Sequence, residues 1–134
     1  MAALYLLDTN ILIAALKGQL GVRKRLNSLP LSAMRLSAIV LGELEFGAEK
    51  SAHGERNRIR LAALAQRLPL VGIDFDTTRH YAQVRALLER KGTPIGANDT
   101  WIAAQALTIN ATLVTGNERE FSRVPGLMLE NWLA

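Results

Sequence analysis

Short apolar runs alternate with longer amphipathic segments along the whole chain, a pattern typical of α/β proteins with a parallel sheet. The apolar runs predict strands at residues 3–7, 34–37, 70–73, 112–114 and 127–129. The amphipathic segments predict helices at 9–17, 22–29, 39–51, 56–67, 98–108 and from a cap at Asp76 or Thr77 to about Lys91. We find no repeat, low-complexity tract or linker, so the sequence predicts a single domain spanning 1–134.

Composition and the start of the chain bear on disulfides, metal sites and export. The 134 residues include no cysteine, which excludes disulfides and thiolate metal sites, and 49% of them are hydrophobic. The apolar start of the chain lacks a basic region and is interrupted by Asp8 and Asn10, so we expect neither a signal peptide nor a membrane segment. We therefore expect a cytoplasmic protein.

Charge suggests a polyanionic partner. The formal net charge is +4, and 12 of the 16 basic residues are arginine, whose planar group suits phosphate. The basic residues gather at 23–25, 56–60, 85–91 and 119–123. An ordinary solvated surface would look the same, so charge alone leaves both interpretations open.

Four polar positions are candidates for a shared site. Ligands of open α/β sheets bind beyond the carboxyl ends of the strands. Asp8 follows the first predicted strand, Asn117 follows the strand at 112–114, Asp99 opens the helix before that strand, and Glu43 lies in the helix after the second strand. Each also has a structural explanation: Asp8 and Asp99 as helix caps, Asn117 as a turn residue, and Glu43 as a surface residue.

Helix geometry separates Glu43 from its acidic neighbour Glu45. Residues two apart in a helix point about 200° away from each other. Glu43 has apolar neighbours three and four positions away, whereas Glu45 shares its side with Glu49. We therefore place Glu43 at the buried edge and Glu45 in solvent.

Clustered carboxylates require a compensating charge. Two unit charges about 4 Å apart repel by about 4 kcal/mol at an effective dielectric near 20. Protons or a hard cation must relieve this repulsion. Mg²⁺ and Mn²⁺ bind oxygen ligands, make a bound water more acidic, and neutralise charge that develops on phosphorus. If the four positions share one site with such a cation, they would suit metal-assisted chemistry on phosphorus, and the structural explanation of each residue stays open.

Four motifs in register resemble those of PIN domains, and of VapC toxins among them. The segment from Leu6 to Ile13 resembles the first motif, and Ser37 to Gly47 resembles the second, with the family's acidic residue on Glu43. The segment from Ile95 to Ala104 is similar to the third, with the acidic residue on Asp99, and Leu113 to Phe121 is similar to the fourth. The ending from Val124 to Trp132 also resembles VapC tails.

The resemblance implies a three-layer α/β/α fold around a parallel sheet of four to five strands. It implies a Mg²⁺- or Mn²⁺-dependent endoribonuclease, with structured tRNA as the family-level expectation. It also implies a homodimer that is inhibited by a small VapB-like antitoxin, whose tail crosses the active site. The toxin is expected to contact DNA only indirectly, through this antitoxin. Asp8 and Asp99 match the principal metal ligands, Glu43 assists, and Thr9 and Thr115 match hydroxyl positions that orient the acids or water.

One residue departs from the family pattern. Many PIN domains carry aspartate where this chain has Asn117, and an amide is a neutral ligand that cannot act as a base. Glu118 or Glu120 is a candidate to compensate, although we expect Glu120 to face solvent. The departure keeps open a non-catalytic PIN module that binds RNA or a partner.

A receiver-like signalling domain is the third alternative. Such a domain needs an acceptor aspartate at the end of a middle strand, followed by one strand with Thr or Ser and one with Lys, and we find no such arrangement in the sequence.

Among the other residues, we expect Trp101 and Trp132 in the core and assign no role to His53 or His80.

Overall fold

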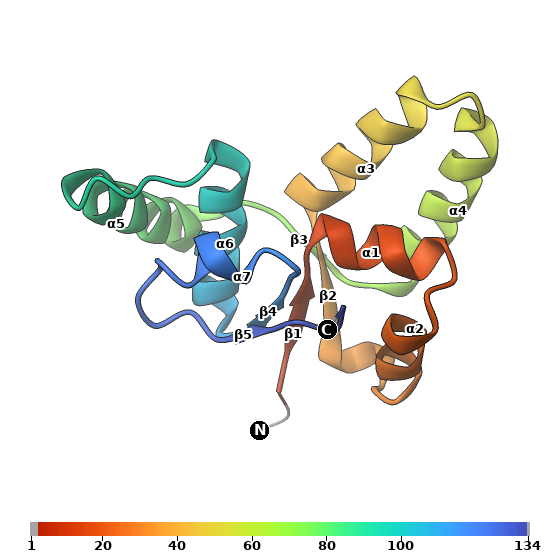
Figure 1. Ribbon diagram of the computed structural model, residues 1–134, viewed down its shortest axis with the longest axis horizontal. Coiled ribbons are helices and arrows are strands. Elements are labelled where there is room, and N and C mark those ends of the chain that lie inside the picture. The colour runs from red at the N-terminus through yellow and green to blue at the C-terminus, as the bar shows by residue number, and fades with distance from the viewer. Residues whose placement is uncertain (1–2, 134) are drawn as a thin grey trace.

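Five parallel strands form the central sheet of the computed structural model, which describes residues 3–133 (Figure 1). The strands are β1 (Tyr5–Leu7), β2 (Met34–Ser37), β3 (Leu70–Val71), β4 (Thr112–Val114) and β5 (Leu129–Glu130). Their order is β3-β2-β1-β4-β5, and every neighbouring pair is parallel. The chain therefore adds β2 and β3 on one side of β1, and then β4 and β5 on the other side. The strand order reverses between β1 and β4, which makes this the switch point of the sheet.

Helices cover both faces of this sheet. The helices are α1 (Thr9–Leu16), α2 (Leu20–Asn27), α3 (Ala38–Lys50), α4 (Gly54–Arg67), α5 (Phe75–Arg90), α6 (Ala97–Ile109) and α7 (Glu118–Phe121). Figure 1 shows α1 to α4 on one side of the strands and α5 to α7 on the other. Right-handed crossovers require this division, because the strand order reverses after β3. The predicted three-layer α/β/α fold with a parallel sheet is confirmed. No helix within residues 3–133 has the length and apolar character that crossing a bilayer requires.

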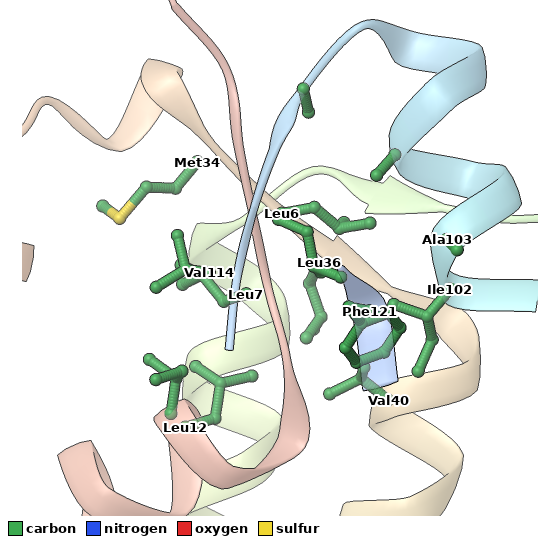
Figure 2. Close-up of a cluster of buried hydrophobic side chains, with 14 of the residues drawn as sticks. Leu6, Leu7, Leu12, Met34, Leu36, Val40, Ile102, Ala103, Val114 and Phe121 are labelled. Carbon is green, nitrogen blue, oxygen red and sulfur yellow. The ribbon is translucent and has the colours of Figure 1, made fainter. Parts of the chain in front are cut away.

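The central strands β1, β2 and β4 are mostly apolar because helices cover both faces of the sheet. Leu6 and Leu7 of β1, Leu36 of β2 and Val114 of β4 are completely buried, and Figure 2 shows them packed together with side chains from the helices. Phe121 of α7 is also fully buried in this cluster, beside Val40 and Ile102 (Figure 2). Helix α7 is thus anchored to the core although it has only one turn.

A buried polar link joins the two helical layers at the end of β2. The Ser37 hydroxyl caps α3 by accepting from the Ile39 amide at 3.1 Å, and it donates to the Gln105 side chain of α6. Gln105 is fully buried and donates to the carbonyl oxygens of Val71 (3.1 Å) and Gly72 (3.0 Å). Since a buried amide left without partners costs about 1–3 kcal/mol, this link fixes α3 and α6 relative to β2 and β3.

The structure corrects the predicted start of the long helix. Asp74 caps α5, because its Oδ1 accepts from the backbone amide of Thr77 at 2.9 Å and from its hydroxyl at 2.8 Å. Asp76 and Thr77 lie inside the helix. Asp74 was not predicted as the cap because the apolar residue Phe75 separates it from the amphipathic pattern. The side chain of Phe75 is exposed.

Two further features escaped sequence reasoning. Helix α7 and a short 3₁₀ turn at Leu31–Ala33 are too short to show a hydrophobic period. The prediction for the tryptophans is half right. Trp132 is buried, whereas Trp101 is only partly buried and stacks on Tyr81 with ring centroids 3.7 Å apart.

Gly54 offers a test of the tight turn between α3 and α4. An alanine Cβ at this position would lie 2.5 Å from the backbone oxygen of Ala48, so the turn would have to shift. We expect Gly54→Ala to lower the free energy of unfolding by about 1–3 kcal/mol in urea titrations. Gly21→Ala in α2, where nothing lies within 4 Å of the new Cβ, is the control and should stabilise by up to about 1 kcal/mol. Equal effects of the two substitutions would contradict the packing.

Candidate active site

Asp8 occupies the switch point at the carboxyl end of β1. Its side chain is 4% exposed, and the two oxygens have different partners. Oδ1 accepts from the Thr9 amide at 2.8 Å and so caps α1, while Oδ2 accepts from the Thr115 hydroxyl at 2.7 Å. The strand register explains the second contact: Leu7 pairs with Val114, so the next residue of each strand comes to the same place. Capping and a position in the site are therefore compatible roles for Asp8.

The loop after β4 is fastened to the start of α1. The Thr115 hydroxyl accepts from the Asn117 amide at 3.0 Å while it donates to Asp8. The Gly116 amide donates to the side-chain oxygen of Asn10 at 3.0 Å. Thr115 thus contacts Asp8 directly, and its orienting role stays a prediction. The contacts also bring in Asn10, which sequence reasoning did not single out. Asn10 lies two residues after Asp8 in the same motif, and that proximity was the available signal.

Glu43 projects from the middle of α3 toward Asp8. It is partly buried, and its Oε1 accepts from the Thr9 hydroxyl at 3.2 Å. Burial raises the pKa of Glu43, the Thr9 hydrogen bond partly opposes this, and the charge of Asp8 raises the pKa further. Glu45 is exposed, so the predicted separation of these two glutamates by helix geometry is confirmed.

Asp99 lies in the first turn of α6 without serving as its cap. Gly96 is the capping residue, which excludes the alternative that Asp99 or Asn98 has this role. The pKa of Asp99 is raised to about 6, first by burial and then by the charges of Asp8, Glu43 and Glu120, in that order. The carboxylate is thus electrostatically coupled to three other acids that are remote in sequence.

Glu120 is the residue that sequence reasoning placed wrongly. We expected it in solvent, but it is partly buried, accepts from the Asn117 side-chain amide at 3.1 Å, and raises the pKa of Asp99. The cause is α7, whose single turn begins directly after Asn117 and brings the side chain three residues later back beside it. The three-residue spacing of Asn117 and Glu120 was the available signal. It indicates a contact only when the residues between them are known to be helical.

Within residues 3–133, none of Asp8, Glu43, Asp99 and Glu120 forms an ion pair. The ion pairs found there join Arg25 to Glu130, Arg58 to Glu49 and Arg85 to Glu89. As the side chains stand, no three acidic, histidine or cysteine groups in this range are close enough to enclose a metal ion. The donor set nevertheless fits Mg²⁺ or Mn²⁺, because such ions need one or two carboxylates and keep several waters. A divalent cation would also relieve the repulsion that raises the pKa of Asp99.

Comparison with known proteins agrees with the motifs. Residues 5–127 match the PIN domain family. The chain belongs to the PIN-domain family. Ribonuclease VapC2 of Rickettsia felis is 41% identical, covering 96% of this chain and 98% of the relative. The tRNA(fMet)-specific endonuclease VapC of Salmonella typhimurium is 42% identical over 96% and 97%. The crystal structure of DNA-bound VapBC from Salmonella typhimurium superposes with a TM-score of 0.90 at 41% identity, covering 97% of this chain and 98% of that one.

Membership of the PIN family has two consequences. It excludes the receiver-like signalling domain, the third alternative left by the sequence. Nucleases of the PIN family also generally use a divalent metal, in keeping with the oxygen donors at this sheet edge.

Asp99→Asn tests the raised pKa of Asp99 without any assay of activity. The folded-state pKa of about 6 lies above the ordinary 3.8, so ionised Asp99 destabilises the fold, and this penalty grows as pH rises from about 4 to above 6. In EDTA, the neutral asparagine should therefore stabilise the protein at pH 7.5 but hardly at pH 4. Because Asp99 is partly exposed, solvent screening limits the gain to about 1 kcal/mol.

Thermal unfolding at both pH values measures this difference, with exposed Glu45→Gln as the control that should change neither. Added Mg²⁺ should raise the melting temperature of the wild type more than that of Asp99→Asn. A gain that is equal at the two pH values would show that the pKa of Asp99 is not raised in the folded protein.

Proposed function

We propose that this protein is a metal-dependent endoribonuclease, the toxin of a toxin–antitoxin pair, and that the whole chain acts as one PIN domain in the cytoplasm. The observation that carries the proposal is the group of coupled, unpaired carboxylates at the switch point of a PIN fold. Relatives over 40% identical that are named ribonuclease and tRNA-specific endonuclease support the same reaction. We propose structured tRNA as the substrate class and a homodimer as the working form.

In this proposal Asp8 and Asp99 hold Mg²⁺ or Mn²⁺, and Glu43 assists. When bound, the cation increases the acidity of water and neutralises negative charge on the phosphate. Thr115 fixes one oxygen of Asp8, and the Thr9 hydroxyl holds the carboxylate of Glu43, which positions the attacking water. Asn117 completes the pocket as a neutral group. The arginine clusters hold the RNA backbone, which positions the substrate without specifying its sequence.

Cleavage of RNA with Mg²⁺ or Mn²⁺ tests these roles. We expect Asp8→Ala and Asp99→Asn to reduce the rate by at least about 100-fold, because each removes a group that acts on the developing charge. Glu45→Gln, on the solvent side of α3, should keep the wild-type rate. Equal rates for all four proteins would reject the assignments. A protein that binds RNA without cutting it, and whose Asp8→Ala variant still arrests growth, would establish the non-catalytic alternative.

A groove beside the site supports neutralisation by an antitoxin. It lies between α1, α3 and α4, has a volume of about 260 Å³, and has an apolar wall of Ile13, Leu16, Leu44, Ala48 and Leu61. Lys17, Asn57, Arg60 and Glu43 supply its polar lining. An amphipathic segment fits such a groove, and one that reaches Glu43 also reaches the carboxylates. Solved VapBC complexes of relatives motivate the choice of a VapB-like antitoxin as the occupant, with DNA contacted only through that partner.

Gly47 provides a way to block this groove without damage to the fold. It lines the groove, and nothing lies within 4 Å of a Cβ added there. We expect Gly47→Leu to weaken binding of the antitoxin encoded by the neighbouring reading frame at least about tenfold, since a branched side chain displaces one apolar anchor. RNA cleavage should be unchanged. Gly21→Leu, an equally open glycine on α2, is the control in calorimetric titrations. Unaltered affinity of Gly47→Leu would place the antitoxin elsewhere.

A further inference from the structure

A second hollow lies along α3, toward the start of α6. It has a volume of about 340 Å³ and is lined by Ala38, Ile39, Gly42, Glu43, Phe46 and Asn98. Glu43 lines both this hollow and the groove between α1, α3 and α4, so it separates the two. Asn98 directly precedes Asp99 in α6. The hollow therefore adjoins the carboxylates at which the proposed reaction takes place.

Phe46 supplies an aromatic surface in this hollow. Its side chain is 63% exposed, and the Lys50 ammonium lies 4.9 Å from the centre of the ring. An isolated exposed apolar residue needs no explanation, but this one lines a concave surface beside a charged site. Proteins that bind single-stranded nucleic acids combine such groups: bases stack on the aromatic ring, and the basic group attracts the phosphate backbone.

Gly42 keeps the hollow open. A glycine within a helix costs about 1 kcal/mol relative to alanine, and a Cβ at Gly42 would meet nothing within 4 Å. Packing inside the protein therefore does not require a glycine at this position. Its effect is to leave the helix backbone accessible between Ile39 and Phe46, where a flat group can approach closely. The Asn98 side chain on the opposite wall offers both a hydrogen-bond donor and an acceptor.

We propose that this hollow binds one unstacked nucleobase of the RNA, next to the phosphate that lies at Asp8 and Asp99. Phe46 stacks on the base, and the amide of Asn98 hydrogen-bonds to its edge. Unpaired loop bases are the part of a structured RNA that proteins bind in this way. The inference rests on the proposed function, because it is the cleavage of RNA at the carboxylates that brings a flanking base to Glu43.

Binding and cleavage are measured separately, so that the two proposals fail separately. Binding of unfractionated tRNA is measured in the Asp99→Asn background, which stops cleavage under the proposed function. There we expect Phe46→Ala to weaken binding about 5- to 100-fold, the effect of losing one stacked base. Phe46→Trp should keep the affinity, and Phe46→Leu should lose it despite its apolar bulk. Ile59→Ala, an apolar residue on α4 that is 66% exposed, is the control.

In the cleaving protein, the RNA ends produced are sequenced. Asn98→Ala should broaden the base preference beside the cut and leave the cutting of a preferred tRNA substrate detectable. Unchanged affinity of Phe46→Ala would overturn the inference, as would full affinity of Phe46→Leu. A loss of the dimer in Phe46→Ala, measured by light scattering, would instead identify the hollow as an interface between protein chains. If the wild type cuts no RNA but its tRNA binding depends on Phe46, the proposed function fails and the base site stands.

Discussion

The repulsion between carboxylates at one edge of the sheet is the constraint on which this molecule is organised. Asp8, Glu43, Asp99 and Glu120 come from four separate segments, and each approach of two such groups costs free energy that packing elsewhere has to supply. The strand register holds Asp8 against Thr115, and the buried link from Ser37 to Gln105 holds the helices that carry Glu43 and Asp99. A fold that invests stability in this way gains a place where a hard cation binds more strongly than water-exposed carboxylates would hold it.

The sequence was sufficient wherever a local rule decides the outcome. Asp8 follows a buried strand, so its place at the carboxyl edge could be predicted from the strand alone, and the orientation of Glu43 could be predicted from helical periodicity. Glu120 could not be placed, since its position depends on a single turn that has no hydrophobic period. The stack of partly buried Trp101 on Tyr81 could not be predicted either, because it is a tertiary contact between α5 and α6. The cap at Asp74 was missed because Phe75 separates it from the amphipathic pattern.

Helix α3 combines the features that a regulated nuclease needs. One side lines the apolar groove with Leu44 and Ala48, another lines the hollow that contains Phe46, and Glu43 lies between them. A segment bound in the groove and a base bound in the hollow would therefore approach the same carboxylate from opposite sides. Under the two proposals, competition for Glu43 would couple the segment and the base without a change in the conformation of the protein.

Asn117 acquires a different meaning once its partner is known. An aspartate at this position would repel the Glu120 carboxylate, whereas the asparagine side-chain amide donates a hydrogen bond to Glu120 Oε2 at 3.1 Å. The neutral residue thus allows Glu120 to remain partly buried, close enough to raise the pKa of Asp99. The site therefore has its negative charge on Glu120, three residues along the chain, instead of on residue 117. The amide at 117 therefore gives no independent reason to favour a non-catalytic module, and the electrostatic demand for a cation persists with it in place.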